Sequence, residues 1–172
     1  MNVITSKLSN NTIESISLSA LAQQCHISSD DLDATTEAEL KDFLQASQNL
    51  LEEKYNVVFG VNSFESVFKI KNQNKIYLPK FPVISVEDKN IKVINGESVT
   101  ILMLPYKVSS DNYTVKYSAG WNVEDIPADV IQCLKMLVSY YFNNRDAQQE
   151  KQLYSPAFAV EALMHKYNSQ II

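Results

Sequence analysis

The sequence predicts an α+β fold, in which a helical bundle carries a small antiparallel β-sheet inserted between its second and third helices. Before Gly60 and after Gly120, apolar residues recur with the spacing of amphipathic helices. Between these two glycines, apolar and polar residues alternate, which is typical of strands. The chain has 172 residues, of which 45% are hydrophobic, and this is enough for one domain with its own core.

We expect a single domain over residues 1–172, made of four stretches. They are an N-terminal arm (1–16), a helical stretch (17–59), a β-rich insertion (60–118) and a helical stretch with a C-terminal tail (119–172). No basic start is followed by an apolar run, and no apolar stretch approaches the roughly 20 residues that span a bilayer. The sequence therefore predicts cytosolic synthesis and no membrane partner.

Two helices are expected before the strands. The segment Ser17–Cys25 predicts a short helix with Leu18 and Leu21 on one side. Thr36, with Glu39 three residues later, has the form of a capping box. The apolar stripe that follows predicts a long amphipathic helix from Thr36 to about Tyr55.

The insertion is expected to contain several short antiparallel strands. Its first strand should place Phe64, Ser66, Phe68 and Ile70 on one face. Pro79 and Pro82 favour a break or an edge position, because proline cannot donate a ladder hydrogen bond. The dipeptide Asn95-Gly96 tolerates the positive φ of a tight hairpin turn, and we expect such a turn there. The segment from Asn112 to Gly120 is the last expected strand.

The helix after Pro127 has more apolar surface than one contact needs. One stripe runs along its length, and it consists of Val130, Ile131, Leu134, Leu137, Val138 and Tyr141. Cys133, Met136 and Tyr140 recur on a different side, and Phe142 lies on the other flank. The sheet and the Thr36–Tyr55 helix could cover both sides within one subunit. Alternatively, these four residues contact a neighbouring copy, since Met and Tyr are enriched at interfaces. A final short helix should end near Tyr167.

Catalytic and metal-binding patterns are absent from the sequence. Only three glycines occur, which excludes the glycine-rich loops that hold phosphates. The two histidines, His26 and His165, belong to no recognisable triad, and Cys25 and His26 point about 100° apart on a helix. Cys25 and Cys133 are expected to be free thiols, and no clustered spacing suggests a zinc site. We expect no enzymatic activity, no metal and no cofactor.

Charge is distributed unevenly along the chain. Residues 30–54 carry eight acids and two lysines, a balance of −6, whereas residues 64–117 carry five acids and eight lysines, a balance of +3. The acids Asp30, Asp31 and Asp33 are candidates for a solvated helix start, for pairing with a neighbouring subunit, or for an acidic wall that repels a polyanion. Residues 17–33 have the rhythm of a helix-turn-helix, but these acids have the wrong sign for binding phosphates.

Four phrases, in the same order, resemble the head–tail connector proteins of tailed bacteriophages, which sit beneath the portal. The resemblance covers about Ser17 to Tyr167. Its parts are "SLSALAQQCHISSDDLDATTEAELKDFLQASQNLLEEKYN", "IYLPKFPVISVED", "VKYSAGWNVEDIPADVIQCLKMLVSYYFNNRD" and "SPAFAVEALMHKYN". In the third phrase, the matching positions are Tyr117, Gly120, Pro127, Tyr141 and Arg145. The N-terminal arm and residues 90–112 match no feature of the family.

The resemblance implies a structural virion protein that forms a homo-oligomeric ring, expected to be dodecameric. Such a ring lies at the head–tail junction, binds the portal protein and a stopper or tail-completion protein, and is assembled in the host cytoplasm. Double-stranded DNA is expected to pass through its channel and to make non-specific contact with the ring. The tail beyond the last helix, with Tyr167, Ile171 and Ile172, is a candidate for docking on the portal or a neighbour. The rival functions are a DNA-binding regulator using residues 17–33 and a small enzyme with an unrecognised site.

Overall fold

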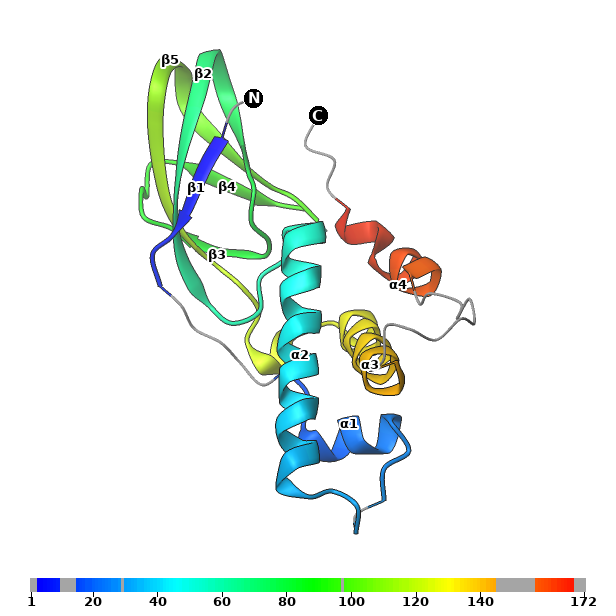
Figure 1. Ribbon diagram of the computed structural model, residues 1–172. Helices are drawn as coiled ribbons and strands as arrows, with labels where there is room; N and C mark the ends of the chain where they lie inside the picture. The colour runs from blue at the N-terminus through cyan, green and yellow to red at the C-terminus, as the bar shows by residue number, and fades with distance from the viewer. Residues whose placement is uncertain (1–2, 10–14, 29, 97, 145–156, 169–172) are drawn as a thin grey trace. The chain divides into compact units, whose positions relative to one another are not determined.

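The chain divides into two compact units. The computed structural model describes residues 3–9, 15–28, 30–96, 98–144 and 157–168 (Figure 1). The sheet unit consists of Met1–Ile13, Tyr55–Glu124 and Lys166–Ile172, and the helical unit consists of Glu14–Lys54 and Asp125–His165. The chain therefore passes from one unit to the other four times. The expected single domain over residues 1–172 stays a prediction.

The sheet unit contains one antiparallel sheet. Its strands, within the described residues, are β1 (Val3–Lys7), β2 (Asn62–Leu78), β3 (Val83–Val86), β4 (Lys92–Asn95) and β5 (Thr100–Ala119). They follow the order β1-β2-β5-β3, and β4 pairs with another part of β5. The two long strands thus form the centre, and every other strand attaches to one of them.

The long β2–β5 pair bends over on itself. The pairing runs from Asn62 opposite Ala119 to Leu78 opposite Thr100, with register shifts between Phe68 and Lys75. Such shifts are β-bulges, which bend a strand and increase its twist. Figure 1 shows both strands curving over beside their labels and returning. Both halves of the pair contribute to one buried cluster, so the sheet encloses its own core.

The alternation expected in the first half of β2 is confirmed. Phe64, Ser66, Phe68 and Ile70 are all buried, while the residues between them are half-buried or exposed. Ser66 is a buried polar side chain, and its hydroxyl oxygen lies 3.2 Å from the Tyr117 hydroxyl and 2.9 Å from that of Thr5. These contacts provide the hydrogen bonds that a buried hydroxyl needs.

The predicted fold class, a helical bundle with a small inserted sheet, is wrong. The sheet is large, because β2 has 17 residues and β5 has 20. It is also more than an insertion between two helices, since Val3–Lys7 of the expected N-terminal arm forms β1 and pairs with β2 from Phe64 to Phe68. Polar residues such as those near Asn72 hide this continuity, because they interrupt the apolar alternation where the strands bend.

The predicted tight turn at Asn95-Gly96 is also wrong, although a hairpin does form there. Asn95 pairs with Thr100, so four residues, 96–99, connect the strands. Neither Asn95 nor Gly96 has a positive φ. Instead, the Gly96 N–H donates to the Val99 carbonyl at 2.8 Å, which closes a wider loop.

The helical unit is built from α1 (Leu18–Gln24), α2 (Ala34–Tyr55), α3 (Ala128–Asn143) and α4 (Ala157–Met164), as counted in the described residues. Tyr55, the last residue of α2, belongs to the sheet unit. Short 3-10 turns follow at η1 (Val123–Asp125) and η2 (His165–Tyr167). Within this unit α3 contacts both α1 and α4. Its predicted stripe is largely buried, with Val130, Leu134, Leu137 and Val138 inside and Ile131 and Tyr141 half-buried.

Helix α2 begins two residues earlier than predicted, with a different cap. The Thr36 N–H donates to Asp33 Oδ1 at 2.8 Å, so Asp33 caps the helix and the expected Thr36–Glu39 box is wrong. This hydrogen bond to the carboxylate holds the pKa of Asp33 below its ordinary value. The cap is therefore present at neutral pH and weakens as the pH falls and Asp33 is protonated.

The entry and exit segments of the sheet unit meet at two glycines. Gly120 has φ 133°, and a Cβ placed on it would lie 2.0 Å from the Gly60 carbonyl oxygen. Backbone hydrogen bonds hold this approach, from Gly60 N–H to Trp121 O, from Trp121 N–H to Val58 O and from Gly120 N–H to Pro82 O. Only glycine tolerates both this φ and this contact.

We predict that Gly120→Ala destabilises the protein by at least about 3 kcal/mol, because it adds a backbone clash to a strained φ. Urea denaturation followed by circular dichroism measures this loss. Gly96→Ala is the matched control, since its Cβ would lie 3.2 Å from the Val99 carbonyl at an ordinary φ. Gly96→Ala should lower the free energy of unfolding by less than about 1 kcal/mol. Equal losses in the two variants would contradict the role given to the Gly60–Gly120 contact.

Candidate functional site and interaction surfaces

Cys25 and His26 do not form a reactive pair. Cys25 is buried, whereas His26 is exposed and has φ 57°. The His26 N–H donates to Gln23 O and the Ile27 N–H donates to Ala22 O, the two hydrogen bonds of a Schellman motif that ends α1. His26 therefore occupies the left-handed position of a helix end, and its place is explained by backbone geometry.

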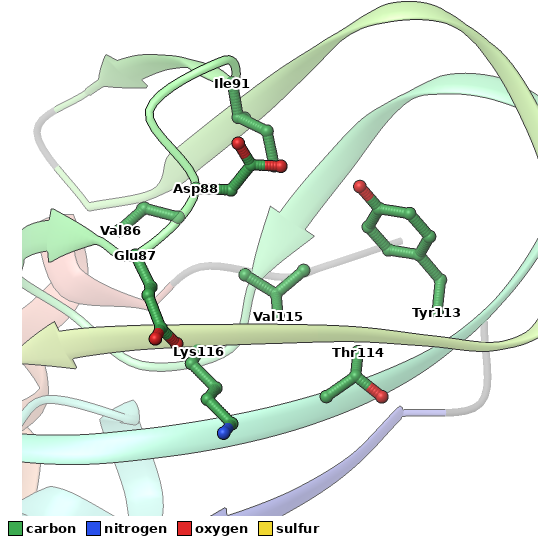
Figure 2. A pocket seen from close by; sticks show the side chains of 8 residues that line it. All are labelled: Val86, Glu87, Asp88, Ile91, Tyr113, Thr114, Val115 and Lys116. Atoms are coloured by element: carbon green, nitrogen blue, oxygen red, sulfur yellow. The ribbon is translucent and has the colours of Figure 1, made fainter.

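One open pocket of about 350 Å³ lies in the sheet unit (Figure 2). It is found where the chain leaves β3, beside residues 113–116 of β5, and its apolar lining includes Val86, Ile91 and Val115. Burial, followed by the nearby Asp88 carboxylate and the Tyr106 phenol, raises the pKa of Tyr113 above its ordinary value. The raised pKa keeps this phenol protonated at neutral pH, which makes it a weak nucleophile.

Metal-ligand clusters and membrane spans are both lacking in the part of the chain that the structure describes. No three His, Cys, Asp or Glu side chains gather there in a way that could hold a metal ion. Among the same residues, no helix has both the length and the apolar character needed to cross a membrane.

The second apolar side of α3 is covered in part by α4. Cys133 is fully buried, and its Sγ lies 3.9 Å from the Val160 carbonyl oxygen of α4. Tyr141 stacks on Phe43 of α2 with ring centroids 6.1 Å apart, and Tyr140 packs edge-on against Tyr141 at 6.0 Å. Helix α4 thus covers Cys133. From the sequence, only the sheet and the Thr36–Tyr55 helix were expected to cover this side of α3 within one subunit.

Three of the four residues expected at a subunit interface keep part of their surface exposed. Met136, Tyr140 and Phe142 are half-buried. Only Cys133 is enclosed by its own chain. The role of these four residues at an interface stays a prediction, and Cys133 could contribute to it only by positioning α3 against α4.

The acids before α2 lie on the surface. Asp30, Asp31 and Asp33 are exposed, and the Ser28 hydroxyl donates to Asp31 Oδ2 at 2.6 Å. Nine residues, 25–33, separate α1 from α2. A DNA-binding helix-turn-helix usually has a turn of about 3–4 residues, so this connection is long for that motif.

Of the three residues expected to dock at the C-terminus, the structure describes only Tyr167. Tyr167 is buried in the sheet unit, where its ring centroid lies 5.7 Å from that of Trp121 and 6.3 Å from that of Phe81. Ile171 and Ile172 lie outside the described residues. Tyr167 is therefore occupied within its own chain, and docking by the tail stays a prediction that depends on the residues after it.

The two units carry opposite net charges. The sheet unit has ten lysines and six acids, a net charge of +4. The helical unit has five basic residues and fourteen acids, a net charge of −9. These values add to the −5 of the whole chain, and they sharpen the uneven charge seen in the sequence.

An apolar patch lies on the outer face of the sheet, and the sequence reasoning did not find it. Tyr77, Ile101 and Ile94 are cross-strand neighbours, and Met103 follows two residues after Ile101 on the same face. Tyr77 is 37% exposed and Ile94 is 42% exposed. These residues come from three strands, so only the strand pairing could have brought them together.

Comparisons with known proteins give a family from one search and a fold from another. The family model described as "Head completion protein" matches residues 16–153. A chain from the virion of a native gene transfer agent particle superposes with a TM-score of 0.76 and 13% identity, covering 98% of this chain and 97% of that one. A chain from the neck of an empty gene transfer agent particle, computed with C6 symmetry, gives a TM-score of 0.75 and 14% identity over the same shares.

A third similar chain comes from the neck of the native gene transfer agent particle computed with C12 symmetry. Its TM-score is 0.62 at 17% identity, covering 94% of this chain and 96% of that one. The search of curated proteins finds no match. At these identities the three structures establish the fold, and the family rests on the match to residues 16–153.

We predict that Cys133 does not react with iodoacetamide in the native protein at pH 8. Burial, with a smaller effect of the Asp129 carboxylate, raises the pKa of this thiol from 9.0 to about 11. The unfolded thiol ionises from about pH 9 and the folded one only near 11, so folding stability should fall as the pH rises through this window. Mass spectrometry measures the labelling. The exposed neighbour variant Gln132→Cys should label readily, and equal labelling of Cys133 would contradict its burial under α4.

Proposed function

The chain belongs to the head completion protein family, and from that premise we propose that it is a ring-forming subunit at the head–tail junction of a phage-like particle. The family match carries this proposal, because it covers residues 16–153 and so includes the helical unit and most of the sheet unit. Proteins of this family are structural and not enzymes. The chain is accordingly a structural head–tail connector.

The partners of the ring belong to the same proposal. We propose that it binds the portal on one side and a stopper or tail-completion protein on the other, with double-stranded DNA passing through its centre. The similar chains come from the virion and neck of gene transfer agent particles, and one of those necks was computed with C12 symmetry. This supports a twelve-membered ring, and the virion as its location.

A closed ring needs two different surfaces on each subunit, because one patch must meet another on the next copy. The opposite charges of the two units supply such a pair. The exposed parts of Met136, Tyr140 and Phe142 are further candidates for this contact. The residues after Tyr167, including Ile171 and Ile172, are candidates for docking on the portal.

Electron microscopy of the full-length protein mixed with its portal protein tests the proposal. We expect a ring of additional density that caps one end of the portal and has an open channel at its centre. Bovine serum albumin mixed with the same portal is the control for non-specific attachment. A portal without added density, at concentrations well above those of the particle, would sink the proposal.

Removing the acids before α2 should strengthen DNA retention by the ring. We propose that Asp30, Asp31 and Asp33 line the channel, where carboxylates avoid the phosphate-neutralising contacts that add affinity. In the triple variant Asp30→Asn, Asp31→Asn, Asp33→Asn the cap of α2 remains, because Asn caps as well as Asp. We expect rings of this variant to retain duplex DNA at low salt several-fold more strongly than wild-type rings.

Filter binding with labelled duplex DNA measures this retention over a range of salt concentrations. The matched control is Glu37→Gln, Glu39→Gln, Glu52→Gln, which removes the same amount of charge from α2 itself. If the triple Asn variant and this control bind DNA equally, the three acids before α2 do not face the channel.

A further inference from the structure

The second half of the sheet carries two cross-strand rows on its outer face. In the first row, Tyr77 of β2 lies opposite Ile101 of β5, and Ile101 lies opposite Ile94 of β4. In the second row, Met103 has Lys75 of β2 on one side and Lys92 of β4 on the other. Rows two residues apart share a face, so these six side chains form one surface, which we call the outer patch.

The outer patch lies on the face of the sheet opposite the core, as the burial of the alternating residues shows. Ile76 and Leu102, which alternate with the residues of the outer patch, are fully buried in the core of the sheet unit. In the outer patch, Lys75 and Lys92 are exposed, Ile101 and Met103 are half-buried, and Tyr77 and Ile94 are exposed. Four apolar side chains thus lie together on this face, with one of them, Met103, between two lysines. Such a face is unusual for a surface that only meets water.

The chemistry of the outer patch specifies its partner. The apolar rows require an apolar side chain at the centre of the contact. The flanking lysines require carboxylates on either side of that side chain, since like charges would repel. An amphipathic, acidic helix has this arrangement, because residues three, four and eight apart lie on one face.

Helix α2 has such a face on its exposed side. Leu50 is 39% exposed, although it is a large apolar residue on the surface of a helix. Asp42 lies eight residues before it and Glu53 three residues after it, and both are exposed. Ala46, one turn before Leu50, is exposed and small, so it leaves room for the side chains of a sheet. We call these four residues the α2 face.

We propose that the α2 face of one copy docks on the outer patch of the next copy in the ring. Leu50 packs against Tyr77, Ile94 and Ile101. Asp42 and Glu53 meet Lys75 and Lys92. Charge complementarity favours a second copy as the partner, because the outer patch belongs to the unit of net charge +4 and the α2 face to the unit of net charge −9.

The spacing of the charges differs between the two surfaces by about 6 Å, which lysine side chains can span. At 1.5 Å per residue, the two acids of the α2 face are about 16 Å apart along the helix axis. Two strand spacings separate the lysines of the outer patch by about 10 Å between backbones, and flexible lysine side chains extend beyond that. Because the two surfaces differ, each copy can bind one neighbour with each of them, which is the heterologous contact that closes a ring.

Charge reversal with rescue tests this contact in the full-length protein. The variant Lys75→Glu, Lys92→Glu and the variant Asp42→Lys, Glu53→Lys should each weaken assembly by at least about 100-fold at low salt, because each places like charges together. The variant with all four changes should assemble again, because the attraction is restored with opposite sign. Sedimentation velocity measures assembly, alone and with the portal, and circular dichroism checks that each variant is folded.

The control reverses two lysines on the central strands β2 and β5, away from the outer patch. Lys69 and Lys116 are exposed and make salt bridges within the chain to Asp111 and Glu65. Since exposed pairs contribute little, the variant Lys69→Glu, Lys116→Glu should assemble as the wild type does. A second measurement uses Leu50→Cys with Ile94→Cys, which should form disulfides between copies under mild oxidation, while the buried Cys25 and Cys133 stay reduced.

The inference rests on the proposed ring, and the outcomes separate the two. If the wild type assembles but the reversed variants assemble equally well, the contact is wrong and the ring stands. The same holds if Lys75→Glu, Lys92→Glu forms rings that no longer bind the portal, because the outer patch then meets the portal. If the wild type forms no ring, either alone or on the portal, the proposed function is wrong and the contact fails with it.

Discussion

The close approach of Gly60 and Gly120 is the constraint on which the rest of the sheet unit depends. It brings the segment that enters the sheet after α2 against the segment that leaves β5. Hydrogen bonds from Gly60, Gly120 and Trp121 connect these segments with each other and with Pro82, just before β3. The indole of Trp121 then gathers Phe59, Phe81 and Tyr167 around it. The segment that enters the sheet, the segment that leaves it and the C-terminal turn at Tyr167 are thus held together at one place.

The sequence predicted the helices and the first half of β2 because their apolar residues follow one period without interruption. It failed where residues distant in the chain determine the structure. β1 is an edge strand with little buried surface, so Val3–Lys7 has no clear apolar pattern of its own. The stretch from Lys71 to Lys75 is polar because β2 bends there, and an alternating pattern cannot show that the strand continues beyond the bend.

The candidate surfaces were predictable to different degrees for the same reason. The two apolar sides of α3 follow from helical periodicity, but the contact of α4 with Cys133 depends on tertiary packing. The acids before α2 are visible in the sequence, but only the structure shows that Asp33 caps the helix. The outer patch could not be found, because Tyr77, Ile94 and Ile101 become neighbours only through the pairing of three strands.

The four passages of the chain between the two units have a consequence for how the protein folds as it is synthesised. β1 is made first, but its partner begins at Asn62, and β2 in turn waits for the second half of β5, which ends at Ala119. The helical unit likewise waits for α3 and α4, near the end of the chain. Since long-range contacts form slowly and late, neither unit can be completed on the ribosome before the other has begun. A chain that stops before α3 thus lacks part of both units.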